Sequence, residues 1–484
     1  MQLPLLGQQR QYGMALNEAL QTAASRSPEI AALRTDVDQR RAELMGEVST
    51  FDWSIYADSA FDSDNTPVGS SLDGAVGRLR EKRWNLQTGL RNLNRSGGQL
   101  SLYNDLGFRR SNSSFLTPPT QGTGRITAEY TQPLLRFSGE SYNTGPISIA
   151  VSRQQQSEAR MAAGVEDHLL RVAQAYWGLV LARGEVILAN RAWSRTAEIV
   201  DVMTRRQDVD VGRGQLFQAR AARATRQTDW TAAGFEARRA QERLLRLING
   251  DMQQSDANLE VLTTSEPTIS QIAANSSRDD LEQHPQIAAA QQAIQASSVE
   301  LSMSQADLQP KLDLILSAYS AGLHEQGKFN RAYQKAWDDS EPGFSVGLNF
   351  EYPLGNRRAV ADLDRRDAQL RRLQYRFQVV VSDVALNIRD RMIAVEKASA
   401  VLLQSAQALE IASQDLSHLQ TRRDLLVDGS RIAELYLDAL LRSQDRLSTA
   451  ELRVLRAQVD LDAAQVNLQH ARGELRKRLP GSAY

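Results

Sequence analysis

Residues 343–355 read Gly-Phe-Ser-Val-Gly-Leu-Asn-Phe-Glu-Tyr-Pro-Leu-Gly. Large apolar side chains at every second position alternate with small or polar ones, which predicts a β-strand with one apolar and one polar face. Pro353 then ends the strand, because proline cannot donate a ladder hydrogen bond. The next proline is Pro480, so the residues that follow the strand are free to form long helices.

Two windows of the chain, residues 147–266 and 354–479, lack proline and are rich in the helix formers Ala, Leu, Gln, Glu and Arg. Each window is too long for one ordinary helix and has one interior break, at residues 208–214 and 428–430. We therefore expect two helical hairpins. Their arms cover about 147–208 with 214–249, and about 356–427 with 431–478.

Strand-like alternation recurs outside the two windows, where most of the aromatic residues also lie. The predicted strands cover about 51–62, 83–92, 99–109, 125–133, 311–319 and 343–352. Their lengths suit tilted strands that cross a membrane, and they suit a small soluble sheet equally well. The chain has no run of 18 apolar residues, which excludes a transmembrane helix.

The sequence repeats itself at two offsets. Residues 28–32 match residues 285–289 at an offset of 257, and the Pro-Leu pair at 133 matches the pair at 353 at an offset of 220. We predict a first repeat over 14–250, including the hairpin at about 147–249, a linker over 251–275, and a second repeat over 276–479, including the hairpin at about 356–478. The offsets differ by 37 residues (257 − 220), about the size of one extra β-hairpin in the first repeat.

The repeats supply four strands, or six if the extra hairpin joins the same sheet. A water-filled barrel needs at least eight strands, so one chain cannot close a barrel. Either several chains share one barrel, or the sheet is small and soluble.

Composition excludes several classes of function. The formal net charge is −1, which gives no general attraction to nucleic acid. The chain has no cysteine, and thus no disulfide, thiolate metal site or lipidated cysteine. Its five histidines have no metal-ligand spacing, and no catalytic constellation is evident. We expect a protein that is not an enzyme and has no cofactor and no metal site.

The duplicated order of strand, Pro-Leu and long helical hairpin resembles the TolC-like outer-membrane efflux channel family, from about Leu16 to Leu479. The segments that carry the resemblance are Ser27-Pro28-Glu29-Ile30, His284-Pro285-Gln286-Ile287, the strand-exit motifs Pro133-Leu134 and Pro353-Leu354, residues 218–221 and residues 429–439.

The resemblance implies an α+β fold whose duplicated helix–strands–hairpin unit builds, in a homotrimer, a shared transmembrane β-barrel continued by a long α-helical barrel. It implies an outer-membrane exit duct with a large periplasmic part. Such a duct passively conducts substrate in a tripartite efflux or type I secretion system. The implied partners are a periplasmic adaptor protein, an inner-membrane transporter and outer-membrane lipid, with no nucleic acid.

By the same resemblance, the hairpin tips gate the pore and select cations. Arg431 falls on the family's tip arginine and Asp438 on one of its ring aspartates, while the other ring position is Leu435 and the acid that pairs with the arginine is replaced by Gln215. The expected adaptor-docking residues are Asp208, Asp210, Gly212, Arg213, Gly429 and Ser430. The simpler alternative is that these are polar turns and solvated residues at helix starts.

A different class of protein also fits long helices, namely a soluble periplasmic coiled-coil adaptor or a structural protein. An adaptor has one hairpin flanked by β-domains, whereas this chain has two hairpins and two strand sets. The first residues form no signal peptide, so we expect either a cytosolic chain or one numbered after its signal peptide was removed.

Overall fold

The computed structural model describes residues 10–70, 72–74, 77–205, 212–249, 259–264, 281, 283–338, 341–421 and 431–479. The chain divides into two compact units. The helical unit comprises residues 1–37, 157–290 and 377–484, and the sheet unit comprises residues 38–156 and 291–376. The division passes through four helices, α2, α4, α7 and α9.

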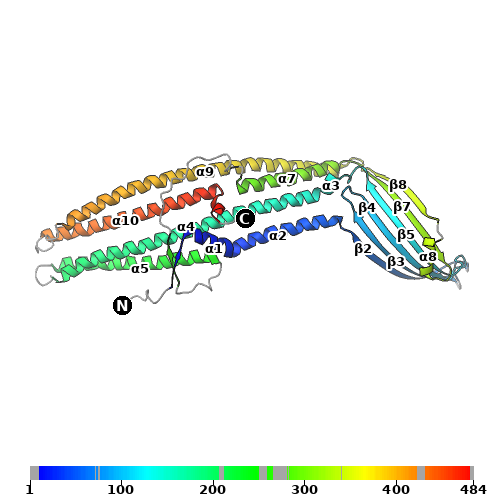
Figure 1. Cartoon of the computed structure of the whole chain (residues 1–484), viewed down its shortest axis with the longest axis horizontal. Helices are drawn as coiled ribbons and strands as arrows, with labels where there is room; N and C mark the ends of the chain where they lie inside the picture. The colour runs from blue at the N-terminus through cyan, green and yellow to red at the C-terminus, as the bar shows by residue number, and fades with distance from the viewer. Residues whose placement is uncertain are drawn as a thin grey trace. The chain divides into compact units, whose positions relative to one another are not determined.

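The helical unit holds two long hairpins (Figure 1). Its elements are β1 (Arg10–Met14), α1 (Leu16–Arg26), α2 (Pro28–Val48), α4 (Gly145–Arg205), α5 (Arg213–Asn249), β6 (Leu259–Thr263), α7 (Pro285–Ala306), α9 (Arg357–Gln420), α10 (Arg431–Ala471) and the 3-10 helix η4 (Leu475–Arg478), the four divided helices only in part. Pro28 and Pro285 are each the first residue of a helix, a position where the missing N–H is not needed.

The main core of the helical unit forms around α4. Leu169, Tyr176 and Leu179 of α4 are fully buried, and they belong to one cluster with residues of α1, α5, α10 and η4. A second cluster joins the ends of α4 and α5 to α9 and α10, and includes Met203 and Leu437. Burial of these aliphatic and aromatic side chains is the main force that holds such long helices together.

The sheet unit contains one antiparallel sheet of six strands in the order β2-β3-β4-β5-β7-β8 (Figure 1). Its strands are β2 (Ser54–Pro67), β3 (Arg78–Leu93), β4 (Gln99–Ser111), β5 (Thr120–Pro133), β7 (Lys311–His324) and β8 (Gly343–Glu351). The 3-10 helix η1 (Ser49–Phe51) precedes β2, and the short helix α3 (Glu140–Asn143) follows β5.

The additional hairpin inferred from the 37-residue difference in offset is β3–β4, and it lies inside the sheet between β2 and β5. Its tight turn needs glycine, because Gly97 has a φ of +91°. The chain therefore contributes six strands to one sheet rather than four. The mixed helix-and-strand class is confirmed, whereas the closed barrel and the trimer stay predictions.

All links between the sheet and the long helices leave from one end of the strands. At that end β2 and β7 start, and β5 and β8 end. We call this the helix end of the sheet. The opposite end, which we call the loop end, carries the connections over residues 68–77, 112–119 and 325–342.

The structure corrects two expectations from the sequence. Residues 259–263 lie in the predicted linker but form β6, which pairs in parallel with β1. Residues 329–338, expected only as the connection between two strands, form α8 (Phe329–Asp338), which packs on β5 and β7. β6 has only five residues, so periodicity alone gave it little signal.

Among the described residues, no helix is long and apolar enough to cross a membrane.

Candidate functional site

Two neighbouring rows of side chains are each of one kind across all six strands of the sheet. One row consists entirely of apolar residues: Ile55, Leu90, Leu102, Ala128, Ala318 and Phe344. The next row is entirely polar or charged: Ser54, Arg91, Ser101, Glu129, Ser317 and Ser345. Because neighbouring positions of a strand point to opposite faces, the sheet has one apolar and one polar face.

The apolar face is largely uncovered in the single chain. Nine of the exposed large apolar side chains of the six strands lie on it: Ile55, Phe61, Leu90, Leu102, Leu316, Phe344, Val346, Leu348 and Phe350. Only Tyr319 and Leu323 are exposed on the other face, and the guanidinium of Arg125 lies 3.8 Å from the ring centre of Tyr319. An exposed apolar surface of this extent indicates contact with lipid or with another protein.

The two edge strands, β2 and β8, each pair on one side only. In β8 every residue except Gly343 is exposed, and β2 is exposed along most of its length. Unpaired backbone groups at such edges need hydrogen-bond partners, and in lipid no water can supply them.

Both strand-exit motifs lie at the helix end of the sheet. Pro133 is the buried last residue of β5, and the Leu134 backbone N–H donates to the carbonyl oxygen of Leu312 at 2.7 Å. Leu134 is 44% exposed and Leu354 is 97% exposed. The structure thus brings the two motifs to the same end of one sheet, where both leucines face outward.

The first hairpin tip is described from Gly212 onward. Gly212 and Arg213 are exposed, and Gln215 caps the start of α5 because its side-chain oxygen accepts a hydrogen bond from the Gly212 N–H at 3.3 Å. Asp208 and Asp210, expected to take part in docking, lie outside the described residues.

The second tip is the start of α10, where Arg431 is the first helical residue. Leu437 is fully buried, whereas Leu435 is 66% exposed. Asp438 is partly exposed, and its carboxylate pairs with Arg442 one turn later at 2.8 Å. This local ion pair was not expected from the sequence reasoning. Gly429 and Ser430 lie outside the described residues.

No protein-family model matches the chain, and no curated protein matches it in sequence. Solved structures do match over nearly the whole chain. The Campylobacter jejuni outer-membrane channel CmeC is 14% identical, with 97% of this chain and 90% of that chain covered and a TM-score of 0.70.

Two further structures agree. The Neisseria gonorrhoeae outer-membrane channel MtrE, in its open state, is 16% identical, covers 96% of this chain and 90% of its own, and has a TM-score of 0.69. The outer-membrane channel OprN is 15% identical, with 95% of this chain and 90% of that chain covered and a TM-score of 0.70.

The chain has the fold of these outer-membrane channels. The resemblance to TolC-like channels expected from the sequence is confirmed at the level of the fold. The sequence identities are too low to transfer the role of any single residue.

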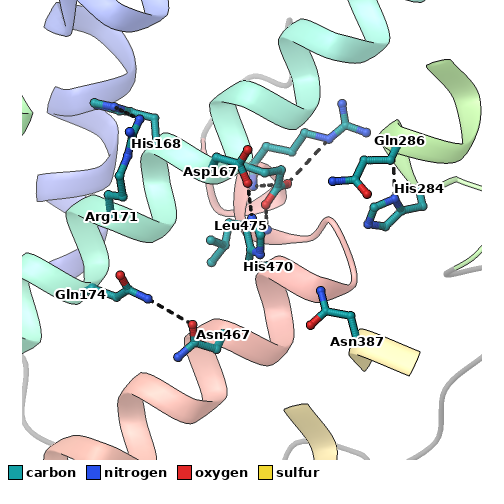
Figure 2. Close-up of polar contacts among 12 residues, drawn as sticks. Asp167, His168, Arg171, Gln174, His284, Gln286, Asn387, Asn467, His470 and Leu475 are labelled. Atoms are coloured by element: carbon teal, nitrogen blue, oxygen red, sulfur yellow. Dashed lines mark hydrogen bonds and ion pairs between the residues drawn. The ribbon is translucent and has the colours of Figure 1, made fainter. Parts of the chain in front are cut away.

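The helical unit also contains a partly buried polar cluster, in which Glu166 and His168 are buried and the Asp167 side chain is exposed (Figure 2). Three consecutive residues of α4 each contact a different segment. The Glu166 carboxylate accepts hydrogen bonds from the backbone N–H groups of Leu475 and Arg476, at 3.1 and 3.0 Å. Asp167 pairs with His470 of α10 at 2.7 Å.

The third residue, His168, lies 3.0 Å from the Glu29 carboxylate through Nδ1 and 3.1 Å from the Leu247 carbonyl oxygen through Nε2. Glu29 also pairs with Arg171. These contacts join α2, α4, α5 and the end of α10 at one level of the helical unit.

Burial changes the acidity of two groups in this cluster. Removal of Glu166 from water raises its pKa to about 7, although the two backbone N–H groups favour its charged form. The pKa of His284 is lowered, first by burial and then by the nearby positive charges of His470 and Arg476. The described residues contain no group of three His, Asp or Glu side chains arranged to hold a metal ion.

Sequence reasoning missed this cluster because its partners are far apart in the chain. The five histidines have no metal-ligand spacing in the sequence, yet His168, His284 and His470 lie in the same region of the helical unit (Figure 2). No spacing signal could have found them. The amphipathic spacing of Phe329, Ala332, Tyr333 and Ala336, in contrast, could have revealed α8.

Proposed function

We propose that the protein is a passive exit duct in the outer membrane, with a large periplasmic part and no enzymatic activity. The observation that carries this proposal is that an apolar row lies beside a polar row across all six strands, with nine large apolar side chains exposed on the apolar face. A sheet with one face toward lipid and one toward water needs this alternation in every strand. The similarity to solved structures of outer-membrane channels adds support.

The proposed duct is a homotrimer with a shared barrel. β8 of one copy would pair with β2 of the next, which satisfies both open edges. Three copies of six strands give 3 × 6 = 18 strands, a number that encloses an aqueous channel. The two predicted repeats, 14–250 and 276–479, would supply the helices of a periplasmic α-helical barrel that continues it.

The proposed partners are a periplasmic adaptor and an inner-membrane transporter of a tripartite efflux or type I secretion system. The adaptor would dock at the hairpin tips, through Asp208, Asp210, Gly212, Arg213, Gly429 and Ser430. Since the chain has no cysteine, Gly212→Cys introduces a single thiol for cross-linking. Cross-links to a periplasmic protein from Gly212→Cys, and none from Gly46→Cys on α2, would support docking; equal cross-linking would contradict it.

The proposed selectivity site comprises Arg431, Leu435 and Asp438 at the start of α10. Three copies of Asp438 around a threefold axis would attract cations, and the pair with Arg442 would weaken that field. In planar-bilayer recordings we expect Asp438→Asn to lower cation selectivity and Arg442→Gln to raise it. If neither variant changes selectivity, Asp438 does not belong to the pore.

Cell fractionation tests the duct itself. The full-length gene is expressed, the outer membrane is isolated, and the size of the extracted protein is measured. We expect an outer-membrane trimer that opens conductances in a planar bilayer. Recovery as a soluble monomer would overturn the proposal.

A further inference from the structure

The loop end of the apolar face carries a set of basic side chains that the duct function does not use. We call this set the cationic rim, and it consists of Lys82, Arg110, Lys328, Arg331 and Lys335. All five are exposed, and within the described part of the chain none of them forms an ion pair with another residue.

Two members of the cationic rim extend the apolar face beyond its aromatic residues. Trp84 of β3 pairs with Phe108 of β4, and two residues nearer the loop end Lys82 pairs with Arg110. A step of two residues keeps the same face of the sheet. The chain therefore passes from aromatic to cationic side chains on one surface.

The acidic residues at this end of β2 and β3 lie on the opposite face. Asp64 and Glu81 pair across the strands and share the face of Arg83. Glu81 is 3% exposed and binds both Arg83, at 2.7 Å, and Arg109. Charges on the polar face are thus neutralised, whereas those on the apolar face have no acidic partner.

The other three members lie on or next to α8, which packs against β5 and β7 on the apolar face of the sheet. The close approach depends on small residues beneath the helix, since a Cβ at Gly124 would lie 2.8 Å from the Cα of Tyr333. At its start, the Phe329 ring lies 5.4 Å from the Trp84 ring between centroids. The helix is therefore fixed on the sheet.

The helix directs its basic residues to one flank. Ala332 and Ala336 are buried against the sheet, and positions 328, 331 and 335 follow the three- and four-residue steps of a single helical stripe. Asp338, at the last position, is the only acidic residue within α8. Trp337 is 67% exposed on another side. An exposed tryptophan beside basic residues is typical of the boundary between lipid and water.

We propose that the cationic rim binds the phosphate groups of anionic lipids in the outward-facing leaflet. The inference rests on the proposed function, which places the apolar face in lipid and the loop end outside the cell. Lysine and arginine at the border of an apolar band extend toward charged headgroups while their stems stay on apolar surface. The rim would also hold α8 at the level of the headgroups.

Lipid titration of the purified full-length protein in neutral detergent tests the proposal. Binding of phosphatidylglycerol, phosphatidylcholine and inorganic phosphate is measured by native mass spectrometry. We compare the wild type with Lys82→Gln/Arg110→Gln and with Lys328→Gln/Arg331→Gln/Lys335→Gln. The control, Arg372→Gln/Arg376→Gln/Arg389→Gln, removes three exposed charges from α9.

We expect the wild type to prefer phosphatidylglycerol over phosphatidylcholine by at least about tenfold. Each neutralised rim residue should weaken that binding about fivefold, and the control should leave it unchanged. Equal losses in the control and the rim variants would overturn the proposal, and so would competition by inorganic phosphate at concentrations equal to the lipid.

Two readouts separate failure of the rim from failure of the duct. Normal recovery of the α8 variant in the outer membrane, with unchanged lipid preference, would refute only the rim. Recovery of the wild type in the soluble fraction would refute the duct. The double variant alters β3 and β4, and the triple variant alters α8 and the residue before it. If one of them misfolds, the other still tests the proposal.

Discussion

The long first helices of the two hairpins, α4 and α9, have similar compositions but bury their side chains very differently within the helical unit. Over residues 157–205, α4 buries thirteen apolar residues, and only Ile187 is an exposed large one. Over residues 377–420, α9 buries three, Val384, Ile388 and Leu416. It leaves six large ones exposed: Val379, Leu386, Ile393, Val401, Leu403 and Ile411.

The exposed residues of α9 are not randomly placed. Val379, Leu386 and Ile393 are seven residues apart, which puts them on one stripe of the helix. A different stripe, including Val384 and Ile388, packs against α7 and α10. The comparison shows that α4 is satisfied within the chain, whereas α9 has a second apolar stripe that a second copy of the chain could cover.

The largest expected effect is on α4. Leu179→Ala should lower the free energy of unfolding by about 2–5 kcal/mol, because a fully buried leucine leaves a cavity. Leu386→Ala, at a side chain 58% exposed in the single chain, should cost the monomer less than about 1 kcal/mol. Urea unfolding of both variants checks this. Equal losses in monomer stability would mean that the contrast between the helices is wrong.

A buried charge on α4 gives the next effect. Since the pKa of Glu166 is raised to about 7, its folded form binds more protons than the unfolded chain above pH 4.5. Its contribution to stability is complete below about pH 4.5 and is lost as the pH rises through about 7, a change of roughly 3 kcal/mol at most. Glu166→Gln should make the melting temperature less dependent on pH over this range.

The matched control is Asp383→Asn on α9, where the carboxylate is exposed. This variant should keep the wild-type pH dependence. A Glu166→Gln protein whose melting temperature still falls between pH 4.5 and 7 would show that another group is responsible.

The outward stripe of α9 gives a smaller effect per residue, and this effect appears in assembly rather than in monomer stability. Leu386→Ser and Ile393→Ser should each weaken the proposed trimer by about 1–2 kcal/mol, or roughly ten- to thirtyfold, through the loss of apolar burial between copies. Light scattering over a dilution series in detergent measures this. Ser382→Ala, at an exposed polar position of the same helix, serves as the control. If neither Leu386→Ser nor Ile393→Ser changes dissociation, the stripe does not contact another copy of the chain.

Ion pairs to α10 should give effects of the same size or smaller. Arg195 of α4 binds Glu451 at 2.7 Å with both side chains mostly buried, whereas Asp415 of α9 binds the exposed Arg446 at 3.1 Å. We expect Glu451→Gln to cost about 1–2 kcal/mol and Asp415→Asn less than about 1 kcal/mol. Thermal unfolding at low and high salt distinguishes them, and a larger loss for Asp415→Asn would reverse the expected order.

Long periodic elements could be predicted from the sequence, and contact-dependent ones could not. Missing prolines and the break near residue 208 placed the first hairpin close to the observed α4 and α5. The offset arithmetic anticipated β3 and β4, because insertions change spacing without erasing the repeat. Glu166 and the pair between Asp438 and Arg442 escaped prediction, since burial and the choice of a partner depend on packing. β6 also escaped prediction, because its strand conformation depends on pairing with β1.

The position of β3–β4 has a consequence for how such a protein could change size. The hairpin leaves β2 at the loop end and returns to β5 at that same end, so β2 and β5 remain antiparallel whether or not it is present. Strands can therefore be gained or lost in pairs without rerouting the chain into the long helices. In the proposed duct, width and length would then be separately adjustable: the number of hairpins sets the width of the sheet, and helix length sets how far the chain extends toward the proposed adaptor.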